Sequence, residues 1–133
     1  MAAPYRIAEA AALLGVSDDT VRRWIDSGRL TSTRTPGGHH EVEGVALAQL
    51  AQALGTDPAP GSSSRSSRNR LRGIVTRVVR DTVMAQVEIQ AGPHRVVSLL
   101  SREAADELEL EPGVLAIATV KSTNVGIELP GKA

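Results

Sequence analysis

The stretch Ser66-Ser67-Arg68-Asn69-Arg70-Leu71-Arg72-Gly73 decides how this chain is organised. It places hydroxyl, amide and guanidinium side chains together, directly before a β-branched run that is typical of a strand. A second polar motif, Lys121-Ser122-Thr123-Asn124-Val125, lies near the other end of the same strand-rich region. The two motifs therefore bracket one folded segment, and the chain before Ser66 has a different character.

The bracketed region predicts five strands. They are expected at Gly73–Arg80, Val83–Gln90, Arg95–Leu100, Val114–Val120 and Val125–Leu129. Within the second, alternate side chains point to one buried face, namely Val83, Ala85, Val87 and Ile89. Ser101 is expected to cap a short helix over Arg102–Leu108. Five strands and one short helix predict a small OB-like five-stranded β-barrel.

The first half of the chain has helical periodicity. The apolar residues that follow the i, i+3, i+4, i+7 pattern of a first helix are Ile7, Ala10, Ala11 and Leu14. Gly15 is a helix stop, and Ser17 can cap a second helix whose apolar face includes Trp24. A third amphipathic helix is expected over residues 47–54, after a short β-branched run at Leu30–Thr35 and a Pro-Gly-Gly turn. Two short helices joined by a tight turn are typical of a helix-turn-helix.

Residues 55–65 are rich in Pro, Gly and Ser, a composition that predicts a flexible linker. We therefore expect an α+β chain of two domains, with a winged helix-turn-helix at residues 1–54 and the barrel at residues 66–133. Each domain has a thin core at this size, so we expect a homo-oligomer formed through the barrels.

Composition excludes several classes of protein. The chain has 133 residues, zero formal net charge, no cysteine and three histidines, of which His39 and His40 are adjacent. Disulfides and cysteine metal sites are excluded, and the histidines are too few for a metal site. No apolar stretch is long enough for a bilayer and none is of signal-peptide type, so a cytoplasmic protein without a membrane partner is expected. No acid/base pair or activated nucleophile is visible, so we do not expect an enzyme.

Several motifs of the first half resemble the MerR/excisionase-like winged helix-turn-helix. They are Tyr5-Arg6-Ile7-Ala8-Glu9-Ala10-Ala11, Leu14-Gly15-Val16-Ser17, Thr20-Val21-Arg22-Arg23-Trp24, Gly28-Arg29-Leu30 and Arg34-Thr35-Pro36-Gly37-Gly38-His39-His40. The resemblance covers residues 5–54 and implies binding of double-stranded DNA, with the second helix in the major groove and the wing on the backbone. The candidate DNA contacts are Ser17, Thr20, Arg22, Arg23, Arg34, Thr35, Gly37, Gly38, His39 and His40.

Charge alone does not single out this half as a DNA binder. Residues 1–60 hold five arginines against seven acidic residues, a net charge of −2. Arg22 and Arg23 also fit an ordinary solvated helix face. We therefore expect weak binding by a single copy and stronger binding by a dimer.

The second half resembles the Mop/TOBE (molbindin) family over roughly residues 66–130. The resemblance rests on Ser67-Arg68-Asn69, Leu71 and Gly73, Ser101, and Lys121-Ser122-Thr123. It implies a site for a tetrahedral oxyanion, molybdate or tungstate, held by Ser67, Arg68, Asn69, Ser101, Lys121, Ser122 and Thr123. Such a dianion is best held by neutral donors with one or two cations nearby. The three segments would meet at the rim of a closed barrel or between subunits.

Two positions depart from the family pattern. Ala104 stands where the family often has a second hydroxyl, and Ser122 replaces a small alanine. Each donor segment alone also has a plain structural interpretation, since Ser101 could only cap a helix and Lys121 could only end a strand. The order of the three segments, with strands between them, favours the ligand site.

OB-like barrels also bind single-stranded nucleic acid, through aromatic side chains that stack on bases. The only aromatic residues are Tyr5 and Trp24, so none lies in the barrel, which argues against this function. Three hypotheses remain. They are a molybdate/tungstate-responsive DNA-binding transcriptional regulator, a molybdate storage protein, and an excisionase-like architectural DNA binder whose barrel only oligomerises.

Overall fold

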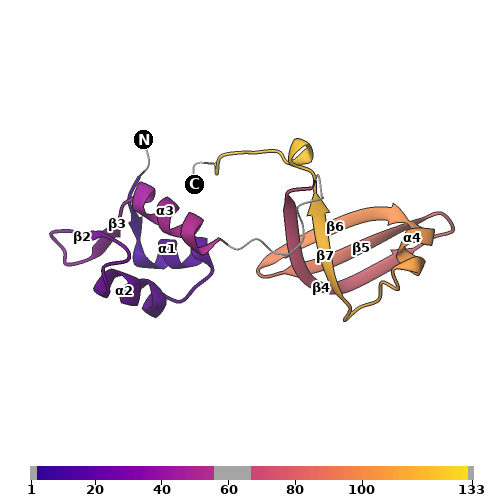
Figure 1. Cartoon of the computed structure of the whole chain (residues 1–133), viewed down its shortest axis with the longest axis horizontal. Coiled ribbons are helices and arrows are strands. Elements are labelled where there is room, and N and C mark those ends of the chain that lie inside the picture. The colour runs from indigo at the N-terminus through magenta and orange to yellow at the C-terminus, as the bar shows by residue number, and fades with distance from the viewer. Residues whose placement is uncertain (1–2, 56–66, 132–133) are drawn as a thin grey trace. The chain divides into compact units, whose positions relative to one another are not determined.

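The structure is a computed structural model that describes residues 3–55 and 67–131. It divides into two compact units, Met1–Thr56 and Asp57–Ala133 (Figure 1). The expected linker at 55–65 lies outside the described residues, except for Gly55. Within the described ranges, every helix is too short or too polar to traverse a lipid bilayer.

The N-terminal unit contains three helices and a small antiparallel sheet. Its elements in chain order are β1 (Tyr5–Arg6), α1 (Ile7–Leu14), α2 (Asp18–Asp26), β2 (Ser32–Arg34), β3 (His40–Val42) and α3 (Gly44–Leu54). The three strands lie in the order β1-β3-β2, so β2 and β3 form a hairpin. The three expected helices are therefore present, and part of the β-branched run at Leu30–Thr35 forms the first strand of this hairpin.

Local signals fix the boundaries of the first two helices. Gly15 ends α1 in the left-handed conformation, with φ of 68°, which glycine adopts without a steric penalty. Ser17 then caps α2, because its hydroxyl accepts a hydrogen bond of 3.2 Å from the Thr20 amide. Val21, Leu30 and Val42 are completely buried in the core that these elements share.

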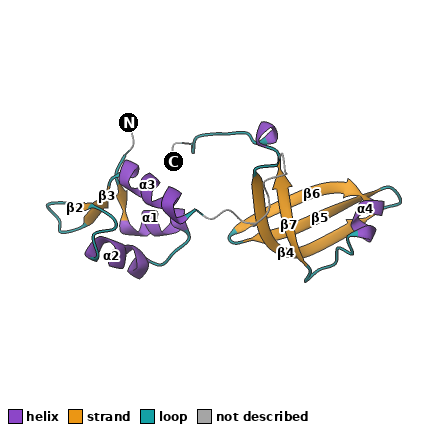
Figure 2. Ribbon diagram, in the orientation of Figure 1, coloured by secondary structure: helices purple, strands orange, loops and turns teal. Residues whose placement is uncertain are grey.

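The C-terminal unit is a curled, open half-barrel (Figure 2). Its elements are β4 (Asn69–Arg80), β5 (Met84–Ala91), β6 (His94–Ser101), α4 (Arg102–Glu107), β7 (Leu115–Val120) and a 3-10 turn at Ser122–Asn124. All neighbouring strands are antiparallel and lie in the order β6-β5-β4-β7. The edges β6 and β7 do not pair with each other, so the barrel stays open.

The long strand β4 bends because it pairs with two different strands. Residues 69–74 of β4 pair with β7, whereas residues 74–80 pair with β5 and include a bulge between Val75 and Arg77. At the crossing, a Cβ atom on Gly73 would lie 2.3 Å from the Gln90 carbonyl oxygen and 2.7 Å from Ile89 Cγ2. Only glycine fits such a close backbone approach. The curvature of the half-barrel therefore depends on Gly73.

The expectation of five strands is corrected to four. Residues Val125–Leu129 form no strand in the structure, although they alternate apolar and other side chains. A strand needs a hydrogen-bonded neighbour, and this segment leaves the sheet after the 3-10 turn without pairing to either edge. Ile127 and Leu129 are consequently 90% and 88% exposed.

The alternation expected in the second strand is largely confirmed. Ala85, Val87 and Ile89 are buried, but Val83 precedes β5 and is 67% exposed. Glu88 was expected on the solvent face and is instead buried, because it is covered on that face and forms an ion pair with Arg95 of β6. Pairing makes burial of a carboxylate tolerable.

The substitution Gly73→Ala is expected to destabilise the half-barrel by about 2 kcal/mol, because the new methyl group must displace backbone of β5. Far-UV circular dichroism during urea unfolding measures this loss. Trp24 is the only tryptophan and lies in the N-terminal unit, so its fluorescence transition should stay unchanged. Gly131→Ala is the control, since its Cβ would meet open space. Equal stability of the two variants would contradict this account of the bend.

The substitution Ser17→Ala is expected to lower the free energy of unfolding of the N-terminal unit by about 1 kcal/mol, because it removes the side-chain cap of α2. Trp24 fluorescence during urea unfolding measures the change directly. Ser17→Asn keeps an oxygen that can accept the same bond and should restore stability. If Ser17→Asn were as unstable as Ser17→Ala, the hydroxyl would matter for another reason.

Candidate functional site

Two of the three expected oxyanion segments lie side by side at one end of the half-barrel. Asn69 at the start of β4 pairs with Val120 at the end of β7. The Asn69 side chain strengthens this pairing, because Nδ2 donates a hydrogen bond of 3.1 Å to the Val120 carbonyl. Ser67 and Arg68 therefore lie beside the segment Lys121–Thr123. Of the set, Asn69 acts first as the residue that joins the two segments.

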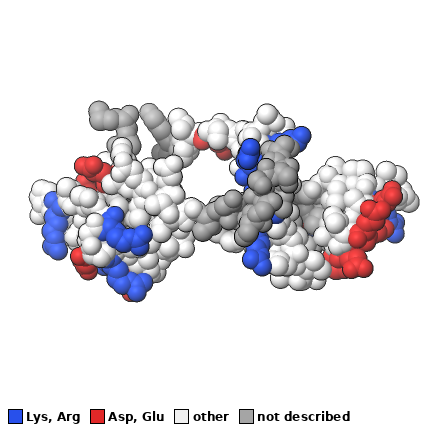
Figure 3. Space-filling view, in the orientation of Figure 1, with Lys and Arg blue, Asp and Glu red and all other residues white. Residues whose placement is uncertain are grey.

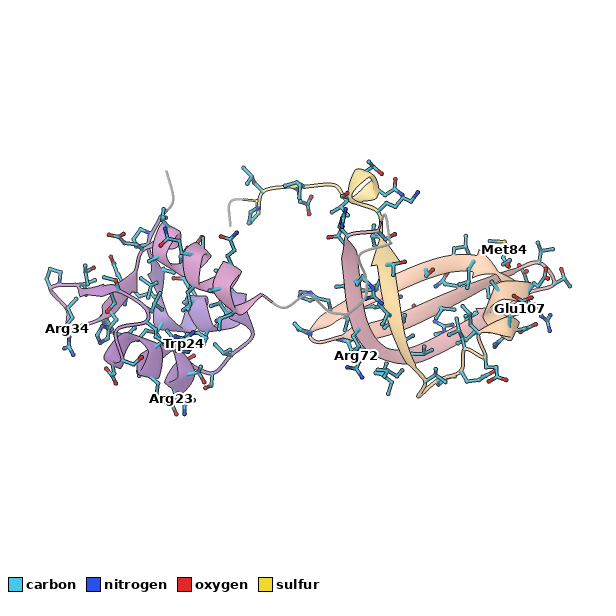
Figure 4. The ribbon with its side chains drawn as sticks, viewed as in Figure 1. Arg23, Trp24, Arg34, Arg72, Met84 and Glu107 are labelled. Atoms are coloured by element: carbon cyan, nitrogen blue, oxygen red, sulfur yellow. The ribbon has the colours of Figure 1, made fainter. Side chains whose placement is uncertain are left out.

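This end of the half-barrel is positively charged. Neither residues 67–75 nor residues 115–124 contain Asp or Glu. The cations there are Arg68, Arg70, Arg72 and Lys121. Figure 4 shows Arg72 at this end of the unit, and Figure 3 shows blue side chains gathered over it. Lys121, Ser122 and Thr123 are exposed and Ser67 is half-buried, so the hydroxyls and the ammonium group are accessible to an anion.

Ser101 lies at the opposite end of the same unit. It pairs with Met84 where β6 ends, close to the end of β4 at Arg80. Figure 4 shows Met84 and Glu107 of this end far from Arg72. The strand β4 alone separates the two ends by roughly 36 Å of chain contour at about 3.3 Å per residue. One chain therefore does not bring Ser101 to the other two segments, and a site at the rim of one barrel is ruled out.

The Ser101 end is held by a network around the turn between β4 and β5. The Ser101 hydroxyl caps α4 by accepting a bond of 3.0 Å from the Ala104 amide. Asp81 Oδ1 accepts bonds of 2.6 Å from the Met84 amide and 2.8 Å from the Val83 amide. These two bonds hold the pKa of Asp81 below its ordinary value, Met84 having the larger effect. The stabilisation is present above the pKa of the unfolded chain and is lost as pH falls through the lowered pKa.

A second polar site lies on the N-terminal unit, in a cleft of about 460 Å³. The start of α1, the start of α2 and the hairpin β2–β3 enclose it. Its lining comprises Arg6, Ile7, Ala8, Asp18, Arg22, Arg34, Gly38, His39 and His40. Three arginines face a single carboxylate there, so positive charge is concentrated in the cleft although the half as a whole is acidic.

The sequence reasoning did not select Arg6, which contributes to this cleft. Arg6 is far in sequence from Arg22 and Arg34, and only the fold brings the three together. Its side chain is exposed at the start of α1, while its backbone amide donates to Glu9 at 3.0 Å. An arginine at a helix start beside an expected DNA-reading helix was the one available signal.

The expected contacts on α2 divide into two groups. Arg22 lines the cleft and lies 3.6 Å from the Asp19 carboxylate, which is an exposed pair. Arg23 lies outside the cleft lining, and its Nη2 donates to the Thr20 hydroxyl at 3.1 Å. Ser17 and Thr20 are joined through their hydroxyls at 3.0 Å, so both also serve the helix start.

The expected contacts on the hairpin also divide. Thr35 and His39 close the turn through a backbone bond of 2.8 Å, and the Gly38 amide donates to the Thr35 carbonyl at 2.9 Å. His40 is half-buried, with Nδ1 3.0 Å from the Ser32 hydroxyl. Thr35, Gly38 and His40 thus build the hairpin, whereas Arg34, Gly37 and His39 are exposed on it. Figure 4 shows Arg34 on the hairpin and Arg23 on α2 reaching into solvent.

Two families of known domains match the two units. Residues 4–55 match a helix-turn-helix domain, and residues 65–127 match the TOBE domain. Both resemblances found in the sequence are therefore confirmed.

Among relatives, molybdenum-pterin-binding protein 2 of Clostridium pasteurianum is 37% identical over 65 residues, which are 48% of this chain and 96% of that protein. A molybdate-binding protein from Sporomusa ovata is 29% identical, with a TM-score of 0.48 over 50% of this chain and 98% of that one. The cytoplasmic molybdate-binding protein ModG, solved with molybdate, is 34% identical, with a TM-score of 0.48 over 53% and 52% of the two chains. Through residues 65–127 the chain belongs to the TOBE family of the molybdenum-pterin-binding proteins, and a helix-turn-helix domain precedes that region.

Proposed function

We propose that this protein is a DNA-binding transcriptional regulator that responds to molybdate or tungstate. The observation that carries the proposal is the pairing of Asn69 with Val120, which puts the Ser67–Asn69 and Lys121–Thr123 segments side by side in a TOBE domain. The relatives named above bind molybdenum-pterin or molybdate, which supports the same class of ligand for this chain.

The chemistry of the paired segments suits a tetrahedral dianion. Arg68 and Lys121 supply two cations, and Ser67, Ser122 and Thr123 supply hydroxyl donors. Charge-assisted hydrogen bonds from such groups are about twice as strong as neutral ones. With no carboxylate in either segment, nothing in them repels the ligand.

The proposed site is completed by a second copy of the chain. Ser101 opens a short helix at the far end of the half-barrel, so its hydroxyl reaches the other donors only if it comes from a neighbouring subunit. Two-fold pairing would create two equivalent sites, each with Ser67–Asn69 and Lys121–Thr123 from one copy and Ser101 from the other.

The N-terminal unit is proposed to bind double-stranded DNA as a winged helix-turn-helix. The start of α2 would enter the major groove, where Arg22 and Arg23 can read guanine. The cleft between α1, α2 and the hairpin suits a backbone phosphate, since Arg6, Arg22 and Arg34 converge on it. Pairing of two copies would double these contacts and offset the acidic balance of the unit.

The substitution Lys121→Ala is expected to weaken molybdate binding by about 10- to 100-fold, because it removes one charge-assisted bond. Isothermal titration with sodium molybdate measures the affinity, with sulfate as the competing anion. Arg77→Ala is the control, since Arg77 is exposed on β4 away from both segments. Wild-type affinity in Lys121→Ala, or no heat from the wild-type protein, would contradict the proposed site.

Mixing two impaired variants is expected to restore molybdate binding. Lys121→Ala and Ser101→Gly should each weaken every site, and glycine preserves most of the helix cap. In a mixed pair, one site would lack both groups and the other would be intact, so titration of the refolded mixture should recover high-affinity binding. Recovery would be absent if Lys121 and Ser101 acted in one site of a single chain, or if Ser101 took no part.

The substitution Arg6→Gln is expected to weaken binding to all DNA sequences alike and to reduce the slope of log affinity against log salt by about 0.9, the value for one phosphate contact. Fluorescence anisotropy with a labelled duplex measures both effects across salt concentrations. The control Arg29→Gln removes an exposed arginine outside the cleft and should leave the slope unchanged. Equal slopes for the two variants would exclude Arg6 from the phosphate contact.

A further inference from the structure

The half-barrel has an apolar interior that is open to solvent. A cavity of about 450 Å³ lies between the unpaired edges β6 and β7. Its walls include Val87 and Ile89 of β5, Val96 and Leu100 of β6, and Ala116 and Ala118 of β7. Exposed apolar surface of this kind is unfavourable in water, and a sheet edge with free backbone groups is a template for another strand.

The segment Val125–Leu129 has the pattern of the strand that is missing. Val125, Ile127 and Leu129 alternate with Gly126 and Glu128, the period of a strand with one buried face. The three apolar side chains are nonetheless 43%, 90% and 88% exposed. The chain thus carries an uncovered apolar segment and, in the same unit, an uncovered apolar groove.

We propose that Val125–Leu129 of one copy pairs antiparallel with β6 of a second copy and closes the partner's barrel. Directly opposed residues of an antiparallel pair point to the same face. The inward residues of β6 are Val96, Ser98 and Leu100, which pair with buried residues of β5. The matching register sets Val125 opposite Leu100 of the partner subunit and Leu129 opposite Val96 of the partner subunit.

Strand direction favours the partner over the chain's own β6. The strand β7 ends beside Asn69, at the end of the unit nearer to His94 than to Ser101. From there the segment could follow its own β6 only in parallel, which would leave Lys121–Thr123 far from Ser101. In the antiparallel exchange, Asn124 lies opposite Ser101 of the partner subunit. The exchange rests on the proposed oxyanion site, which it assembles, but strand pairing itself needs no ligand.

Charge complementarity supports the same arrangement. The end of the unit around α4 carries Asp81, Glu103, Asp106, Glu107, Glu109 and Glu111. These acidic side chains gather at one end in Figure 3, opposite the basic end with Arg68 and Lys121. Two of the arginines there, Arg80 and Arg102, are already paired with Asp106. Antiparallel exchange brings the basic end of each copy to the acidic end of the other, which attracts the copies and fixes their register.

Disulfide trapping tests the exchange, and the absence of native cysteine makes it clean. The double variant Val96→Cys/Leu129→Cys should form a covalent dimer under mild oxidation, because directly opposed positions lie within reach of a disulfide. The control Leu100→Cys/Leu129→Cys should not, since parallel closure within one chain is the arrangement that would join those positions. Mixing the single variants Val96→Cys and Leu129→Cys should also yield a covalent heterodimer.

Non-reducing electrophoresis and mass spectrometry without molybdate give the result. A disulfide within one chain, or the absence of the Val96–Leu129 cross-link, would overturn the exchange. Ile127→Asp provides a readout free of cysteine. It should convert the wild-type dimer to monomer in sedimentation and leave Trp24 fluorescence unchanged, and a wild-type monomer or an unchanged dimer would equally overturn the proposal. A cross-linked protein that binds no molybdate would refute the proposed function alone, whereas tight molybdate binding without a cross-link would refute the exchange alone.

Discussion

The close passage of β4 across β5 at Gly73 is the constraint on which the half-barrel depends. Because the position has no side chain, β4 can leave β7 at its midpoint and continue along β5. This bend curls the four strands, opens a groove between β6 and β7, and separates the two ends of the unit. One end receives the segments Ser67–Asn69 and Lys121–Thr123, and the other receives Ser101. The bend therefore also requires that a site using all three segments be shared between copies.

A site shared between copies offers a simple route from ligand to DNA. A bound dianion would hold two barrels together, and two barrels would raise the effective concentration of one helix-turn-helix unit near the other. No rigid path between the units is needed, because the coupling acts through the oligomeric state. Linkage then requires that DNA binding strengthen ligand binding by the same factor. The acidic balance of the N-terminal unit suits this scheme, since it keeps single copies weakly bound.

Local features of the sequence predicted most of the fold. Gly15 and Ser17 mark helix boundaries through contacts within a few residues, and both were read correctly. The strands from Asn69 to Val120 followed from alternation, because each has a neighbour in the same chain. Val125–Leu129 was predicted as a strand from the same pattern, but pattern alone does not say which edge a strand will pair with.

The sites were less accessible to sequence reasoning than the fold. Charge and hydroxyl content drew attention to Lys121 and Ser67, yet their contact depends on the register of β4 with β7, which no local signal reveals. Arg6 was overlooked because its cleft partners, Arg22 and Arg34, are brought to it only by tertiary packing. Thr35 and His40 were selected as DNA contacts, although their nearest partners lie within the hairpin.

The most direct test of the account is the affinity for DNA with and without molybdate. A duplex selected by the protein from a random pool would be titrated by fluorescence anisotropy, at fixed salt, in the absence and presence of saturating molybdate. The account predicts a change in Kd of about 5- to 150-fold, and the same factor in molybdate affinity when DNA is saturating. An unchanged Kd for DNA in protein that binds molybdate tightly would contradict a regulator and leave a molybdate store tethered to DNA.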